Sequence, residues 1–172
     1  MLREVLIAPH PLLEKVSKPV DKIDQSILTL LSDMAETMYA SEGVGLAAPQ
    51  VAVNLRVIVV DTDYDPQDPS TRKIRKFVNP ELTWVSDEDH TGPEGCLSIP
   101  QHYADVVRPK EIKVKYLDEN SKVCELSADG LLSVCIQHEI DHLDGILFID
   151  HLSNLKRNII MRKLLKEKKH VE

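Results

Sequence analysis

The sequence predicts an α+β fold in which one central helix, bearing an HExxH motif, is packed between β-sheets, with a further helix near each end of the chain. Residues 130–145 place apolar side chains on both sides at helical spacing, so this helix is expected to be covered on two faces. Residues 111–117 alternate apolar and charged side chains, and residues 123–127 would return antiparallel to them across a short turn. The chain of 172 residues suits a single domain, 1–172.

The composition excludes several classes of protein. Hydrophobic residues make up 42% and charged residues 28%, as in ordinary folded domains, so a disordered or fibrous chain is excluded. The 28 acidic and 21 basic side chains give a net charge of −7, which is the wrong sign for a protein whose whole surface binds nucleic acid. No stretch has the length of a membrane span and no signal peptide begins the chain, so we expect a cytoplasmic protein without a membrane partner. The three cysteines are expected to be free thiols.

The elements of the first half follow from hydrophobic spacing and from turn-forming residues. Residues 24–41 have apolar side chains at helical spacing before a glycine and predict an amphipathic helix. Residues 43–50, GVGLAAPQ, predict a loop because of their glycines and proline, whereas residues 56–61 predict a short buried strand. Residues 61–76 are rich in Asp and Pro and predict an exposed loop.

The second half is predicted in the same way. Residues 77–84 are expected to hold one strand or two, interrupted at Pro80, and residues 86–93 to form an acidic turn. At the end of the chain, residues 153–170 predict a helix capped by Ser153, with one apolar stripe and many basic side chains elsewhere. The stripe consists of Leu155, Ile159, Ile160 and Leu164.

Residues 138–142 form the HExxH motif of the predicted central helix. Positions i and i+4 share one helix face, so His138 and His142 can direct their imidazole nitrogens at one metal ion. Glu139 lies about 100° around the helix from His138, where a carboxylate can take a proton from water activated by the metal and pass it to a leaving group. Alone, the motif also fits a chance match, which composition produces in on the order of one chain in a few hundred.

Two histidines leave a catalytic metal site one protein ligand short. The usual layouts of HExxH metalloproteases are excluded, because Phe148 stands where a histidine would be needed and no glutamate follows outside the charged tail. The third ligand is therefore expected upstream, and Cys96, beside Gly95, is the best candidate. Taken alone, Cys96 fits a small buried apolar side chain better than a metal ligand, and the other two cysteines keep that interpretation.

Three blocks of the sequence together resemble the peptide deformylases: GVGLAAPQ at 43–50, EGCLS at 94–98 and QHEIDHLDG at 137–145. They occur in the family's order at compatible separations, and the similarity extends over almost the whole chain. The resemblance implies antiparallel sheets around the central helix. It also implies an enzyme that removes the formyl group from the N-terminal formylmethionine of nascent polypeptides and releases formate, with one divalent metal ion as cofactor. That ion is expected to be Fe²⁺, with Zn²⁺, Ni²⁺ or Co²⁺ as substitutes.

The resemblance also implies a role for individual residues. Glu139 becomes the general base and acid. The side-chain amide of Gln50 and the backbone N–H of Leu97 stabilise the oxyanion, which agrees with the negative charge that develops on the former carbonyl oxygen during hydrolysis. The implied metal ligands are Cys96, His138 and His142.

The substrate cleft is described by further matching positions. Gly45 and Gly95 are expected to line it and to let a peptide backbone pair with the backbone of the enzyme. Four apolar side chains are expected to form the pocket for the methionine side chain, although all four would serve as core residues. These four are Val44, Leu131, Val134 and Cys135. Tyr103 stands where some members carry an arginine, so the contacts beyond methionine remain open.

Two other functions fit parts of the sequence. A general HExxH peptidase lacks its downstream ligand, and a purely structural zinc site has no use for Glu139.

Residues 156–172 carry seven basic and two acidic side chains, a charge of +5, which leaves −12 on residues 1–155. This basic segment is either a solvated helix or a docking element for ribosomal RNA. We expect the protein to be a monomer.

Overall fold

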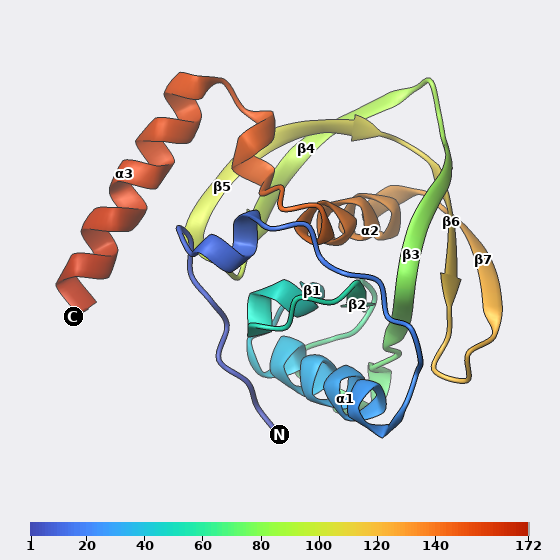
Figure 1. Ribbon diagram of the computed structural model, residues 1–172. Coiled ribbons are helices and arrows are strands. Elements are labelled where there is room, and N and C mark those ends of the chain that lie inside the picture. The colour runs from blue at the N-terminus through green and yellow to red at the C-terminus, as the bar shows by residue number, and fades with distance from the viewer. Residues whose placement is uncertain (172) are drawn as a thin grey trace.

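The computed structural model describes residues 1–171, with side chains up to residue 169, and combines helices with antiparallel sheets as predicted (Figure 1). Glu172, counted above in the charge of the last segment, lies outside the described residues. The α-helices are α1 (Gln25–Ala40), α2 (Gly130–Leu143) and α3 (Asn154–Val171). Within residues 1–171, no helix is both long and apolar enough to cross a lipid bilayer.

Seven strands of residues 1–171 form two antiparallel sheets. The larger sheet has the order β1-β2-β3-β6-β7, and β4 and β5 form the other. The strands of the larger sheet are β1 (Gly45–Ala47), β2 (Val57–Val60), β3 (Arg75–Val85), β6 (Ile112–Leu117) and β7 (Val123–Ala128). The smaller sheet consists of β4 (Asp89–Cys96) and β5 (Ile99–Pro109). In Figure 1, α2 lies at the centre, with β4 and β5 above it and β1 and β2 below it, which confirms the predicted layers.

The larger sheet is covered by a different helix on each face. Along β2 all four side chains are buried and alternate between two cores: Val57 and Val59 pack in the cluster that contains α1, and Ile58 and Val60 in the cluster that contains α2. A strand that is buried on both faces reads as a continuous apolar run, which is why the sequence predicted it. The first helix is also confirmed, since the Asp24 side chain accepts hydrogen bonds from the first backbone N–H groups of α1.

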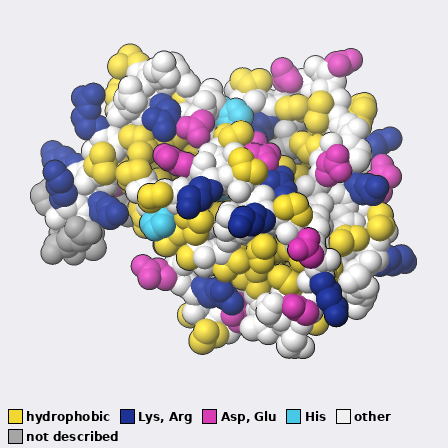
Figure 2. Space-filling view, viewed as in Figure 1, with side chains coloured by type: hydrophobic (Ala, Val, Ile, Leu, Met, Phe, Trp, Pro, Cys, Tyr) yellow, Lys and Arg dark blue, Asp and Glu magenta, His cyan; other side chains and the backbone are white. Residues whose placement is uncertain are grey.

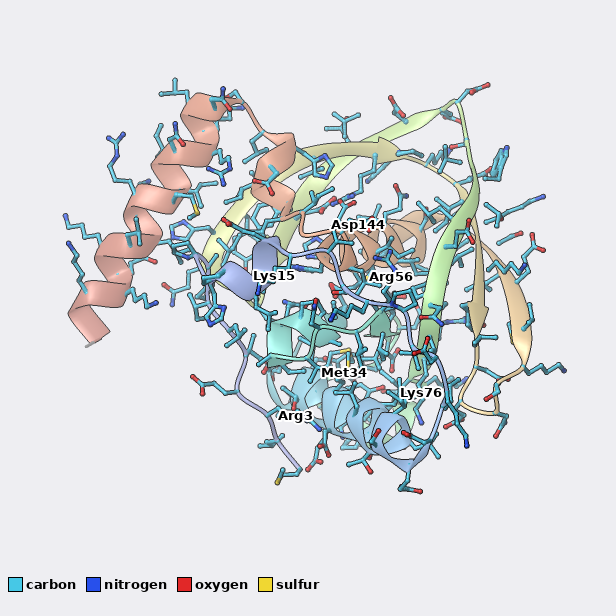
Figure 3. The ribbon with its side chains drawn as sticks, in the orientation of Figure 1. Arg3, Lys15, Met34, Arg56, Lys76 and Asp144 are labelled. Atoms are coloured by element: carbon cyan, nitrogen blue, oxygen red, sulfur yellow. The ribbon has the colours of Figure 1, made fainter. Side chains whose placement is uncertain are left out.

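The C-terminal end of α2 is held by segments from far earlier in the chain. The Leu143 carbonyl accepts hydrogen bonds from the Ser17 backbone N–H (2.7 Å) and from Arg56 Nη1 (3.0 Å). Arg56 also forms an ion pair with Asp144, and the two side chains lie beside each other in Figure 3. Gly145 has a φ of +75°, and a Cβ there would lie 2.5 Å from the Glu14 carbonyl oxygen, so only glycine fits this helix end.

Two predictions for the segments around the strands were wrong. Residues 43–50 are not only a loop, because they contain β1 and a 3₁₀ turn, Ala48–Val51. Residues 86–93 are a turn only at 86–88, because β4 begins at Asp89, whose acidic side chain is exposed. In both segments, glycine and proline weaken the sequence signal for a strand. The strands form because they pair with a neighbour rather than because of local preference.

Two further expectations need correction. β3 is not interrupted at Pro80: the strand continues through it, and a shift of register between Val78 and Glu81 accommodates a residue that cannot donate a backbone hydrogen bond. The apolar stripe of α3 is only half correct. Ile160 and Leu164 pack against the core, whereas Leu155 and Ile159 are 72% and 40% exposed.

Candidate active site

A cavity of about 420 Å³ opens between the segment that leads into β1, the end of β4 and one face of α2. Every site residue predicted from the sequence lines it except His142, which lies behind the surface and is 1% exposed. The lining includes Gln50, Cys96, Leu97, His138 and Glu139 from the predicted catalytic and metal-binding set. It also includes Val44, Gly45, Gly95, Leu131, Val134 and Cys135 from the predicted substrate-binding set. Segments that are distant in the sequence therefore meet in one place.

Cys96, His138 and His142 each direct one ligand atom at a common point. The three atoms all lie within 4.8 Å of one another, and Cys96 Sγ is 3.4 Å from His142 Nε2. A tetrahedral ion with bonds of about 2.0–2.3 Å separates its ligand atoms by about 3.5 Å. The two histidines come from successive turns of α2, as the HExxH spacing predicted, and the thiol comes from the end of β4. This donor set fits a single divalent metal ion.

The charges around the two histidines also suit a cation. Burial by itself lowers the pKa of His138, but hydrogen bonding to Cys96 and Glu94 outweighs it and holds the pKa well above its usual value. Burial, helped by His138, keeps the pKa of His142 well below its usual value, so that ring is neutral. The surroundings thus favour one positive charge at this point. A metal ion held by both rings would supply that charge itself and would leave His138 neutral.

Glu94 and Arg108 form a buried layer behind the metal-ligand cluster, and neither was predicted to have a role. The Glu94 carboxylate accepts from His138 Nδ1 (3.0 Å) and from Arg108 through Nε (2.6 Å) and Nη2 (2.9 Å). Arg108 Nη1 also donates to Asp141 (2.8 Å). Burial alone would raise the pKa of Glu94, but the hydrogen bonds from His138 and Arg108 lower it to about 2. Ionised Glu94 therefore fixes the His138 ring with Nε2 free.

Glu139 lies on the cavity side of α2 and is buried. Its Oε1 is 3.6 Å from His138 Nε2, and its Oε2 accepts no hydrogen bond from residues 1–171. Burial raises the pKa of this carboxyl to about 7. Gly45 packs directly against it: a Cβ on Gly45 would lie 2.9 Å from Glu139 Cγ and 2.8 Å from Cys135 Sγ. The glycine predicted to line the cleft is thus required by the close approach of β1 to α2.

Gln50 is held in one orientation. Its Oε1 accepts from the Ala47 backbone N–H (2.9 Å), so its amide NH₂ group must face the other way. Nε2 donates to Ser98 Oγ (3.1 Å) and lies 3.5 Å from Cys96 Sγ. Leu97 lies between Cys96 and Ser98 in the turn that joins β4 to β5. The two predicted donors to an oxyanion are therefore next to the predicted metal ligand.

The predicted methionine pocket lies on the apolar side of the cavity. Val44 and Leu131 are 38% and 57% exposed, so they face the opening rather than the core, whereas Cys135 is buried and belongs to the core beneath α2 as well. Tyr103 is 73% exposed and covers Gly95, where a Cβ would lie 2.5 Å from the tyrosine ring. Sequence reasoning left Tyr103 without a role, and no local signal could place its ring over the opposite strand.

The chain is similar to known proteins in sequence and in fold. The sequence model of the polypeptide deformylase family matches residues 2–158. A peptide deformylase of Phenylobacterium zucineum (strain HLK1) is 49% identical over 168 residues, which cover 98% of this chain and 98% of that protein. The crystal structure of peptide deformylase from Ehrlichia chaffeensis has a TM-score of 0.91 and 37% identity, and covers 99% of this chain and 98% of its own. A second structure from that organism, in complex with actinonin, has a TM-score of 0.90 and 39% identity, with 96% and 97% covered.

Proposed function

The chain belongs to the polypeptide deformylase family, and from this premise we propose a role for each residue of the cavity. The protein is a hydrolase that removes the N-formyl group from formylmethionyl ends of nascent peptides, in the course of protein biosynthesis, and it depends on a metal ion as the family does. The observation that carries the assignment of residues is the meeting of three ligand atoms within 4.8 Å of one another, on the wall of a cavity that also holds Glu139.

We propose that Cys96, His138 and His142 hold one divalent metal ion, which is Fe²⁺ in the cell and can be replaced by Zn²⁺, Ni²⁺ or Co²⁺. A thiolate with two imidazoles is a donor set that suits all four ions. When bound, the ion supplies Lewis acidity, which polarises a carbonyl and lowers the pKa of water. Protein purified without oxygen should contain iron, and its activity should decay in air faster than that of the Ni²⁺ or Zn²⁺ form, because ferrous iron and a thiolate are both oxidisable.

Glu139 is proposed to move the proton of the reaction. The oxygen of a water molecule bonds to the formyl carbon, Glu139 accepts a proton from that water, and the bond between the formyl carbon and the methionine nitrogen breaks. The nitrogen takes the proton from Glu139 and leaves as an amine. The second proton of the water stays on the other product, formic acid, which loses it at neutral pH and is released as formate. A carboxyl whose pKa is raised to about 7 by burial can both accept and donate a proton near neutral pH.

Gln50 and Leu97 are proposed to stabilise the negative charge on the former carbonyl oxygen. The support is the position of the Gln50 amide, which Ala47 holds with its NH₂ group toward Cys96, and the place of Leu97 next to that cysteine. Donors that are fixed before the reaction need no reorganisation when the charge develops. The removal of one such donor costs about 10²–10³-fold in turnover in other hydrolases.

The substrate is proposed to lie extended between β1 and β4. β1 is an edge strand of the larger sheet, and the cavity exposes both Gly45 and Gly95. The methionine side chain would enter the apolar side of the cavity, against Val44 and Leu131, whose exposure leaves room for it. Val134 and Cys135 complete this pocket from α2.

A formate-release assay on a formylmethionyl tripeptide tests these roles. Glu139→Gln keeps the size of the side chain but cannot carry the proton, so turnover should fall by about 10²–10⁴-fold while bound metal, measured on the same sample, stays at the wild-type level. Glu125→Gln, at an exposed position on β7, is the control and should match the wild type. Normal turnover in Glu139→Gln would show that another group moves the proton.

We further propose that residues 1–172 act as one domain, as a monomer, in the cytoplasm and in contact with the ribosome through α3. The support for the contact is the charge of this helix, since Lys and Arg side chains gather along its outer side (Figure 2). The apolar side chains of Leu155 and Ile159, which are exposed rather than packed, lie on the same helix.

A further inference from the structure

Tyr64 lies outside the cavity and yet contacts its wall. Its hydroxyl donates a hydrogen bond of 2.7 Å to the carbonyl oxygen of Gly43, and Gly43 is one of the residues that line the cavity. Tyr64 belongs to the loop between β2 and β3, which the sequence predicted to be merely exposed. The bond therefore ties this loop to the segment that enters β1.

The Tyr64 ring is itself held firmly. It packs edge-on against Tyr39, with ring centroids 4.8 Å apart and an interplanar angle of 88°. The Tyr39 hydroxyl donates to Asp61 (2.6 Å), a buried carboxylate at the start of the same loop, and the Arg72 guanidinium lies 4.4 Å from the Tyr39 ring centroid. Burial raises the pKa of Tyr64, so its hydroxyl keeps its proton at neutral pH. The donor to Gly43 is thus fixed in place and always protonated.

Gly43 controls how the two walls of the cavity meet. A Cβ on Gly43 would lie 3.0 Å from Leu97 Cδ1, so the backbone of one wall is in contact with a side chain of the other. The next carbonyl, that of Val44, accepts from the Asp61 backbone N–H (2.9 Å). The loop after β2 therefore anchors two successive peptide groups immediately before Gly45, where the edge of β1 begins.

We propose that Tyr64 is a positioning residue that fixes the edge of β1 for pairing with the substrate backbone beyond methionine. This inference rests on the proposed function, because it assumes that an extended formylmethionyl peptide lies along that edge. Tyr64 touches no reacting atom in this arrangement. Its hydroxyl acts through the Gly43 carbonyl, whereas Glu139 and the pocket residues Leu131, Val134 and Cys135 are positioned by α2.

The test compares Tyr64→Phe with the wild type on two substrates, formylmethionine amide and a formylmethionyl tripeptide. Phenylalanine keeps the ring packing against Tyr39 and removes only the hydroxyl. For the tripeptide, KM should rise by about three- to tenfold, because a displaced β1 edge would weaken about one hydrogen bond to the substrate backbone, with kcat within about twofold of the wild type. For the amide, which has no residue beyond methionine, kcat/KM should be unchanged.

Tyr116→Phe is the matched control, because it deletes a hydroxyl from a ring that packs on Phe77 away from the cavity, and it should leave both substrates unaffected. Thermal midpoints of both variants separate a loss of stability from a loss of binding. Unchanged KM values in Tyr64→Phe, with or without a lower midpoint, would overturn the inference, as would an equal loss on both substrates. A wild type that releases no formate would overturn the proposed function and this inference with it.

Discussion

Cys96 lies at the end of β4, where its thiol is close to His142 and to Gln50. We predict that Cys96→Ala loses the metal, because the site then keeps only two protein ligands. Cys124→Ala should retain it, since the Cys124 thiol lies on β7 near Asp118 and Lys122 and is not one of the three clustered ligand atoms. Metal content by mass spectrometry after extensive dialysis measures both.

Cys135→Ala completes the comparison of the three cysteines, all of which are free thiols in the described chain. Cys135 lines the cavity but is not one of the three clustered ligand atoms, so this variant should also keep its metal. It should lose some stability, because a buried side chain that packs in the core beneath α2 becomes smaller. Equal metal loss in all three variants would contradict the assignment of Cys96.

Single residues differ in how far the sequence can assign them. Helical spacing places His138 and His142 on one face, because they lie four positions apart, but their roles and that of Glu139 also depended on the resemblance to a family. The assignment of Cys96 as a ligand depended most on the resemblance to a family, since a lone cysteine is more simply explained as a small buried apolar side chain. Glu94 and Arg108 were missed because their contact depends on the register of β4 against β5, and no spacing within either strand encodes that register.

Arg108 on β5 is paired with Glu94 on β4, and this buried ion pair leads to a prediction about stability. Arg108→Met should lower the free energy of unfolding at pH 7 by about 3–5 kcal/mol, because it leaves the buried Glu94 carboxylate without its partner. The pKa of Glu94 falls from 4.5 to about 2 on folding, so its ionised form stabilises the fold above about pH 4.5, and this contribution is lost as the pH falls toward 2. The difference between variant and wild type should therefore shrink by about 2 kcal/mol at pH 3.

Urea unfolding at pH 7 and pH 3 measures these differences. Lys110→Met is the control, since Lys110 is paired with Glu88 at 3.4 Å on the surface, one residue beyond the ends of the same two strands. Its effect should stay below about 1 kcal/mol at both pH values. A difference for Arg108→Met that is the same at pH 7 and pH 3 would show that Glu94 is not the group that depends on it.

At the scale of elements, regular periodicity was sufficient and irregular strands were not. α1, α2 and the β6–β7 hairpin were predicted because their apolar side chains repeat with the period of a helix or a strand over six residues or more. β1 has three residues and β4 contains glycine and proline, so their local signal is weak. For α3 the helix was confirmed but its buried face was not, since two adjacent stripes are apolar and only packing selects one.

The whole molecule divides into an acidic body and a basic last helix. We predict that Lys163→Glu with Lys166→Glu, two exposed positions on α3, weakens binding to purified ribosomes at low salt and reduces the dependence of binding on salt. Formate release from a short formylmethionyl peptide should be unchanged, because neither side chain lines the cavity. Both substitutions leave Glu167 unchanged, and its carboxylate still contacts His102 on β5.

A control with the same change of net charge is Lys115→Glu with Lys122→Glu, on the β6–β7 hairpin. Co-sedimentation with ribosomes over a range of salt concentrations compares the two double variants. Unchanged binding of the α3 variant would leave α3 as a solvated helix. An equal loss in both variants would mean that net charge, rather than this helix, governs the association.

The cavity is built from three distant segments of the chain, so a new copy of the enzyme can become active only after all three have been synthesised. Gln50 and Cys96 lie 46 residues apart in the chain, and Cys96 and His142 are separated by the same interval. The helix that supplies the histidines is closed at its end by Ser17 and Arg56, from the first third of the chain. A chain whose translation stops before His142 has two of its three segments and no metal centre. An enzyme that acts on unfinished proteins is thus itself inactive until its third segment has left the ribosome.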